Sequence, residues 1–473
     1  MIAVQNYHTV QPRRPGINAV LVTSTGRRTE TKPTSFVARK PPLRLSGMPM
    51  YSQHPSSGLP DDPYRGAGGP PLPQEANPSW MGQVQPEHYR AAPGHQGQPL
   101  TGMVPPHAQG TVLQASRARS GLLGLSVAGG VLAFLSLFLV VPFLLSNTGA
   151  AGFLIGFLAS LVPLAVVLTA VHIIDRWEPE PKRLLFFAFT WGAAVSVAVT
   201  LLIQPFFVIA FQFTDQPDLQ TYMATVQAPI VEEFAKSLGL LILLLAARRQ
   251  FDGPVDGVVF AFTIAGGFAF TENILYFGRA IAESASPASG LAQVFFLRGV
   301  MSPFAHAIFT GTTGLIMGFA ARRWHTGASI GAFVIGLLPA MFLHNRWNSM
   351  GQGFLLDYIV VQVPIFVLAV AGIIFLRVAE KRLTRQRLLE YSAAGWFTPA
   401  EVQLLATHGG RRTALAWAAG AGRKQQMKQL LKAATQLANT RQRILSGRDV
   451  PLNQAEERLQ LQRILALRES VAA

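Results

Sequence analysis

The chain has 473 residues, 50% of them hydrophobic, and only 14% are charged. A soluble protein of this size normally carries about 25% charged residues, so the composition favours a membrane protein. The sequence contains no cysteine, which excludes disulfides, thiolate catalysis and cysteine-ligated metals.

The net charge of +16 is concentrated at the two ends of the chain. Residues 1–120 carry +7 and residues 378–473 carry +9, whereas residues 121–377 are neutral. Two basic tails around a neutral apolar core are typical of retention on the cytosolic side of a membrane. They also suit contact with anionic lipid headgroups. We therefore expect membrane lipids, and no nucleic acid, among the partners.

Residues 1–120 are rich in Pro, Gly, Ser and Gln. Such a composition cannot bury a core, and we expect a disordered cytosolic region. Eight apolar segments follow, most of them close to the roughly 20 residues that cross a bilayer. They are 121–146, 152–174, 184–211, 226–247, 257–277, 300–321, 329–344 and 354–376. Residues 378–473 show short amphipathic patterns that predict a small helical cytosolic region. The expected fold is an all-α polytopic membrane protein with about eight transmembrane helices, which occupy residues 121–377.

Positive charge alternates between the loops that join these segments. Lys and Arg follow the second, fourth, sixth and eighth segments, whereas the opposite loops hold few of them. The positive-inside rule then places both termini in the cytosol of a multi-pass protein of the cell membrane.

Ionisable residues inside the predicted spans indicate a functional site. Each costs about 2.5–3.5 kcal/mol at the centre of a helix, so a function is the default explanation. With the topology above, residues from four helices lie at a common depth near the outer face. They are Glu232, Glu233, Glu272, His306 and His344. A catalytic site explains this common depth better than random placement does.

Three carboxylates with one lysine nearby in sequence call for shared protons, histidinium partners or a metal. Lys236 follows Glu232 by four residues, a favourable order for a helical ion pair. A glutamate with a raised pKa beside a water would act as a general base. Zinc with an open position is the alternative, with Glu272, His306 and His344 as candidate ligands.

Three more polar residues belong to this region of the sequence. Asn273 follows Glu272 directly, and Asn348 follows His344 by four residues, so both are candidate supporting residues. Arg298 lies near a predicted helix end, and we interpret it as an interfacial anchor.

At these residues the chain resembles the PrsW family of intramembrane proteases, within the larger group that includes the CAAX prenyl endopeptidases. The resemblance covers about residues 120–380. Its motifs are, in family order, Asp175–Pro181, Glu232–Lys236, Phe268–Asn273, His306, and the pair His344 and Asn348. It implies an endopeptidase that cleaves single-span, membrane-anchored proteins, with anti-sigma factors as the substrate class of the family.

The mechanistic hypothesis assigns each residue a part. Glu232 or Glu233 activates a water, while Glu272 and His306 position that water or a metal. His344 and Asn348 then stabilise the oxyanion, as donors aimed at the developing charge.

Three other functions compete with this interpretation. A transporter or channel could use the same Glu and His cluster, although such proteins commonly show internal repeats and sites near the midplane. A prenyl-protein endopeptidase would need a site that faces the cytosol, whereas this cluster is predicted near the outer face. A non-catalytic scaffold built on the basic tails would not need several buried carboxylates.

Overall fold

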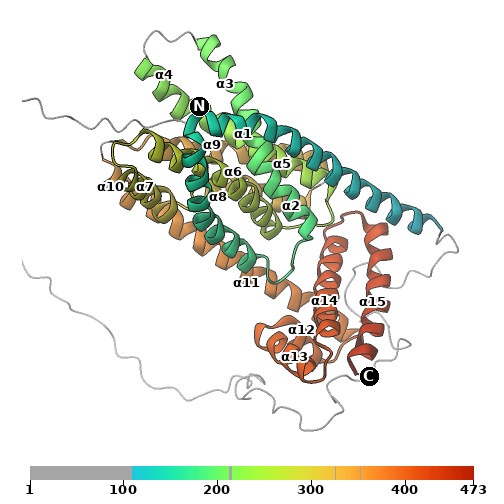
Figure 1. Ribbon diagram of the computed structural model, residues 1–473. Coiled ribbons are helices and arrows are strands. Elements are labelled where there is room, and N and C mark those ends of the chain that lie inside the picture. The colour runs from blue at the N-terminus through green and yellow to red at the C-terminus, as the bar shows by residue number, and fades with distance from the viewer. Residues whose placement is uncertain (1–108, 212–215, 325, 352, 473) are drawn as a thin grey trace, which may run out of the picture. The chain divides into compact units, whose positions relative to one another are not determined.

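The computed structural model describes residues 109–211, 216–324, 326–351 and 353–472, and every regular element in these ranges is helical (Figure 1). The expected disordered region therefore falls largely outside the described residues. In chain order, the described elements begin with α1 (Gln109–Ile174), α2 (Lys182–Thr190), η2 (Trp191–Ser196), α3 (Val197–Phe211), α4 (Gln216–Tyr222), η3 (Met223–Gln227), α5 (Ala228–Ala246) and α6 (Pro254–Glu283). The following elements are α7 (Pro287–Phe295), η4 (Phe296–Met301), α8 (Ala305–Arg323), α9 (Thr326–Asn348), α10 (Phe354–Asp357), η5 (Tyr358–Gln362) and α11 (Val363–Ala393). The last four helices are α12 (Pro399–Ala406), α13 (His408–Gly420), α14 (Lys424–Leu445) and α15 (Val450–Ala472).

Six helical stretches of the described residues are long and apolar enough to cross a membrane. The first, Val127–Ile174, has 48 residues and contains Gly149 at φ 65°, a conformation that interrupts the helix between two predicted spans. Helix α5 is not among the six, and it carries three charged residues: Glu232, Glu233 and Lys236. Counting α1 as two crossings and α5 as one gives the eight that the sequence predicts.

Helix α6 is the central element of the bundle. In the most apolar 18-residue part of α6, 89% of the residues are buried, against 11% in the corresponding part of Phe354–Ala393. Glycines allow its close neighbours to approach, because a Cβ at Gly257 would collide with the backbone of α8 at Gly314. A Cβ at Gly267 would likewise collide with the backbone of α2 at Phe189. This packing holds α6 rigidly between the helices that carry the other polar residues of the site.

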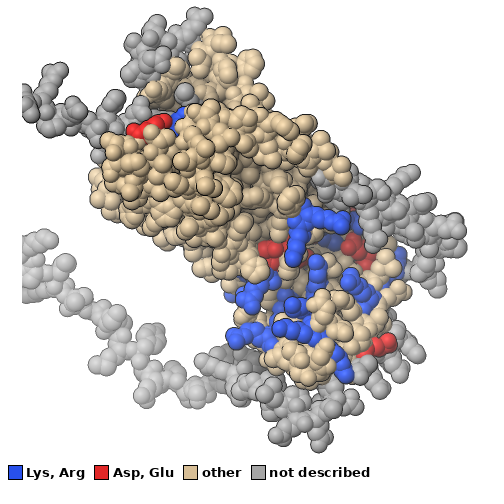
Figure 2. Space-filling model, in the orientation of Figure 1, with Lys and Arg blue, Asp and Glu red and all other residues tan. Residues whose placement is uncertain are grey.

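The C-terminal helices α12–α15 build a second core together with the end of α11. Leu388, Leu437 and Ile464 are among its buried side chains. The Thr398 hydroxyl accepts a hydrogen bond from the Glu401 backbone, and the Glu401 carboxylate accepts one in return, which closes a capping box at the start of α12. Figure 2 shows Lys and Arg side chains gathered over these helices, whereas the drawn face of the bundle is almost free of charge.

The segment between α1 and α2 contacts this C-terminal region. The Arg411 guanidinium lies 3.4 Å from the centre of the Trp177 ring, and its Nη1 donates to the Trp177 carbonyl at 3.1 Å. Asn439 donates a hydrogen bond to Glu178, and Arg443 pairs with Asp252 in the α5–α6 loop. Burial, with other carboxylates close by, raises the pKa of Glu178 to about 8.

Candidate active site

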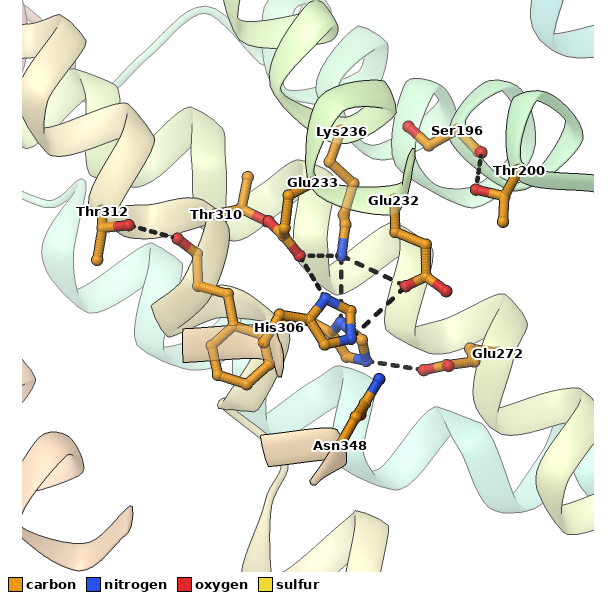
Figure 3. Close-up of polar contacts among 12 residues, drawn as sticks. Ser196, Thr200, Glu232, Glu233, Lys236, Glu272, His306, Thr310, Thr312 and Asn348 are labelled. Atoms are coloured by element: carbon orange, nitrogen blue, oxygen red, sulfur yellow. Dashed lines mark hydrogen bonds and ion pairs between the residues drawn. The ribbon is translucent and has the colours of Figure 1, made fainter. Parts of the chain in front are cut away.

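Four helices supply the polar cluster, as Figure 3 shows. Helix α5 carries the two adjacent glutamates and Lys236 on neighbouring turns, α6 carries Glu272, α8 carries His306 in its first turn, and α9 carries His344 in its last two turns. The structure therefore brings together all five residues predicted as catalytic, and all are buried. Lys236 is completely enclosed, so its charge must be balanced by neighbours rather than by water.

Three hydrogen bonds converge on Glu233. Lys236 Nζ donates to its Oε1 at 2.6 Å, His344 Nδ1 lies 3.0 Å from the same oxygen, and the Thr310 hydroxyl donates to Oε2 at 2.8 Å. The ion pair expected between Lys236 and Glu232 is longer, at 3.8 Å. The principal partner of the lysine is thus Glu233, one residue further along the helix.

A second carboxylate and histidine pair forms on the opposite side of the site. His306 Nε2 lies 2.7 Å from Glu272 Oε2, and Arg298 Nη2 bonds the same oxygen. Arg298 Nε donates to Asn273 Oδ1 at 2.8 Å. The sequence analysis interpreted Arg298 only as an interfacial anchor, whereas in the structure its side chain also bonds Glu272 and Asn273.

These carboxylates determine which ring nitrogens carry protons. An ionised carboxylate only accepts hydrogen bonds, so His344 is protonated on Nδ1 and His306 on Nε2. The lone pairs then lie on His344 Nε2 and on His306 Nδ1, the latter 3.2 Å from Lys236 Nζ. The two rings are perpendicular, with centres 5.2 Å apart.

Glu232 faces this region with an oxygen that makes no hydrogen bond among the described residues. This Oε2 is buried, lies 3.9 Å from His344 Nε2, and has the Lys236 ammonium 3.8 Å away, beyond hydrogen-bonding distance. A buried carboxylate oxygen without a hydrogen bond calls for a proton, a water or a closer cation.

The same atoms fit a metal ion. Glu232, His306 and His344 each offer one ligand atom, and these atoms lie within 4.8 Å of one another. Three protein ligands with an open fourth position are typical of catalytic zinc, and this separation closes on an ion after shifts on the order of one ångström. Glu272, a candidate ligand in the sequence analysis, lies in the outer layer and contacts the other nitrogen of His306.

Asn348 lies at the edge of the cluster (Figure 3) and connects two elements. Its Nδ2 donates to the Ala224 carbonyl at 2.8 Å, and the neighbouring Asn345 bonds the Thr225 carbonyl. These bonds attach the end of α9, which carries His344, to the π-helical turn η3 that precedes α5.

The sequence analysis missed two residues that contact the cluster, Thr310 and Arg298. Thr310 follows His306 by four residues, so both lie on one face of α8, and that spacing could have identified it. Arg298 is the only charged residue between positions 287 and 321 of the sequence. A lone charge in an apolar segment is itself a signal of function.

Comparisons with known proteins agree with this geometry. A family model described as "PrsW family intramembrane metalloprotease" matches residues 180–373, which include every residue of the cluster. Protease PrsW of Oceanobacillus iheyensis is 28% identical over 200 residues, which cover 41% of this chain and 82% of that protein. Protease PrsW of Clostridioides difficile is 32% identical over 158 residues, which cover 33% of this chain and 63% of that protein. No solved structure matches the chain. With the membrane-spanning helices and the glutamate and histidine cluster in family order, residues 180–373 of the chain are similar to the PrsW family of intramembrane proteases.

Proposed function

We propose that the chain is an endopeptidase that hydrolyses peptide bonds of membrane-anchored proteins, with the Glu232 carboxylate as its reacting group. The observation that carries this proposal is the buried Oε2 of Glu232, which makes no hydrogen bond among the described residues and lies near two histidines. Each histidine also hydrogen-bonds another carboxylate: His344 bonds Glu233, and His306 bonds Glu272. These bonds fix the orientations of the two histidine rings beside Glu232, so the three side chains are preorganised around the position that a reacting group would occupy.

Glu232 is the better candidate for the reacting carboxylate than Glu233. Glu233 already accepts hydrogen bonds from Lys236, Thr310 and His344, and it would lose them on taking up a proton. The free oxygen of Glu232 can accept a proton from an attacking water and return it to the leaving amine, as a general acid and base do. Glu233 then acts as the support of His344.

The ligand set for a metal would be Glu232, His306 and His344. A bound zinc would supply Lewis-acid polarisation of the scissile carbonyl and would lower the pKa of water. Glu233 and Glu272 would then hold the ring nitrogens that face away from the ion, the usual arrangement around metal-ligating histidines. The family description as metalloproteases supports this set.

Stabilisation of the oxyanion falls to Lys236 in this proposal. The tautomer of His344 leaves a lone pair, not a proton, on the nitrogen that faces the site, so it cannot donate as the sequence hypothesis required. The Lys236 ammonium is enclosed among Glu232, Glu233 and His306, where its charge is hardly screened. Asn348 keeps a supporting part, because its amide holds η3 against α9.

The substrates we propose are single-span membrane proteins, and membrane-anchored regulators such as anti-sigma factors are the class that the family resemblance implies. Because the site is enclosed by four helices, the segment of the substrate that is cleaved must unwind from its helical conformation to reach Glu232. We propose a cell-membrane location with both termini in the cytosol, where the basic C-terminal helices would meet anionic lipids (Figure 2).

The test compares wild type with Glu232→Gln in cells, by quantitative profiling of new protein N-termini in purified membranes. Glu283→Gln is the matched control, because Glu283 is exposed on the same bundle and pairs only loosely with Arg279 at 3.7 Å. We expect a set of membrane-protein N-termini that wild type and Glu283→Gln produce and Glu232→Gln does not. Identical profiles for wild type and Glu232→Gln, at equal amounts of inserted protein, would refute the proposal. A zinc chelator added to purified protein then separates the two mechanisms, because only the metal-dependent one loses cleavage.

A further inference from the structure

Arg298 makes three contacts with one face of α6. Its Nη2 bonds Glu272, its Nε donates to Asn273 Oδ1 at 2.8 Å, and its guanidinium lies 3.9 Å from the centre of the Tyr276 ring. A planar guanidinium that bonds two neighbouring side chains and stacks on a third has a single orientation. Arg298 is therefore a built element of the structure, unlike a charge that merely marks the membrane interface.

The bond to Glu272 connects Arg298 to the reacting centre. One oxygen, Oε2, accepts hydrogen bonds from both Arg298 and His306. Without the arginine, Glu272 would lose the cation that bonds its Oε2 and would stay buried against the ring of His306, and such a group either rotates or takes up a proton. Either change removes the acceptor that fixes the ring of His306.

We propose that Arg298 is a positioning residue of the peptidase, which acts through Glu272 to hold the His306 ring with Nε2 on Glu272 and Nδ1 toward Lys236. This inference rests on the proposed function and assigns the outer layer of its site. The order of contacts is Arg298, Glu272, His306, and then the reacting centre. A parallel set runs from Lys236 and Thr310 through Glu233 to His344.

A purely structural part for Arg298 has to be distinguished from this one. Of the described residues of α7, none is buried, and in η4 only Gly299 is. The arginine is thus also a main attachment of the segment Pro287–Met301 to α6. If attachment were its only task, its loss would lower stability and the amount of folded protein, while folded molecules would keep their turnover number.

The experiment measures kcat and KM on a substrate that wild type cleaves, for Arg298→Met, Arg298→Lys and the control Arg279→Met. Arg279 is a good match, because its side chain is 13% exposed against 19% for Arg298, and it also bonds neighbouring polar groups, in this case Asn147 and Glu283. We expect Arg298→Met to lower kcat about 10–100-fold, as losses of groups behind a metal-ligating histidine do, with KM within about 3-fold. Arg298→Lys should recover part of kcat, since lysine keeps the charge but not the forked geometry. Arg279→Met should stay within about 3-fold of wild type.

A double-variant cycle with Glu272→Gln decides whether the arginine acts through the carboxylate. If it does, adding Arg298→Met to Glu272→Gln lowers kcat by no more than about 3-fold beyond Glu272→Gln alone. The inference is overturned if the two losses multiply, if Arg298→Met keeps wild-type kcat, or if Arg279→Met loses as much. Failure of the proposed function looks different, because Glu232→Gln would then cleave like wild type, whatever the arginine variants do.

Discussion

Replacing Lys236 by methionine should destabilise the protein more than the removal of a positive charge from its surface does. The Lys236 ammonium lies 2.6 Å from Glu233 and 3.8 Å from Glu232, and none of the three side chains is more than 2% exposed. Methionine is similar in length but leaves both carboxylates without their cation. Removing one partner of a buried ion pair typically costs about 3–5 kcal/mol, because the remaining charge stays buried and uncompensated.

The assay is the free energy of unfolding, measured by titrating the purified protein in mixed detergent micelles with a denaturing detergent. Lys182→Met is the matched control, because Lys182 is exposed at the start of α2 and its replacement changes the net charge equally. We expect that control to stay within about 0.5 kcal/mol of wild type. Adding Glu233→Gln to Lys236→Met should restore a large part of the loss, since it removes the carboxylate that the lysine had paired. The reasoning fails if Lys236→Met costs no more than the control, or if the double variant is less stable than Lys236→Met alone.

Three further predictions concern packing and the C-terminal region. Gly257→Ala should cost about 1–3 kcal/mol in the same unfolding assay, because its Cβ meets the backbone of α8. Gly331→Ala, whose Cβ meets nothing within 4 Å among the described residues, should change little. Since burial raises the pKa of Glu178 from 4.5 to about 8, the folded protein keeps a proton that the unfolded chain has already released. Glu178 should therefore lower stability as pH rises from about 5 to 8, by at most about 1.4 kcal/mol per pH unit from this one group, and Glu178→Gln should reduce the slope of unfolding free energy against pH over that range. Arg411→Ala and Trp177→Ala should each speed tryptic cleavage of the C-terminal helices, because each removes the stacking of the guanidinium on the indole ring. Unchanged cleavage in both single variants would contradict the docking of that region.

The sequence by itself was enough to predict the membrane class and the all-helical fold, and to single out the glutamates and histidines that the structure brings together. Hydropathy and the cost of a charge in a bilayer act along the chain, so apolar segments and the residues that interrupt them can be found without a fold. The common depth of Glu232, Glu272 and His306 followed from alternating topology alone. The helical C-terminal region was likewise visible in its short amphipathic patterns.

Only the tertiary structure decided how these side chains pair. The rotation of each helix about its axis, set by packing such as the glycine contacts of α6, selects which faces meet. Helix packing thus places Lys236 closer to Glu233 than to Glu232 and places Arg298 against Glu272. It also leaves one oxygen of Glu232 without a hydrogen bond among the described residues. Spacing along one helix limits the neighbours of a residue, but contacts between helices depend on crossing angles and distances that no single segment encodes.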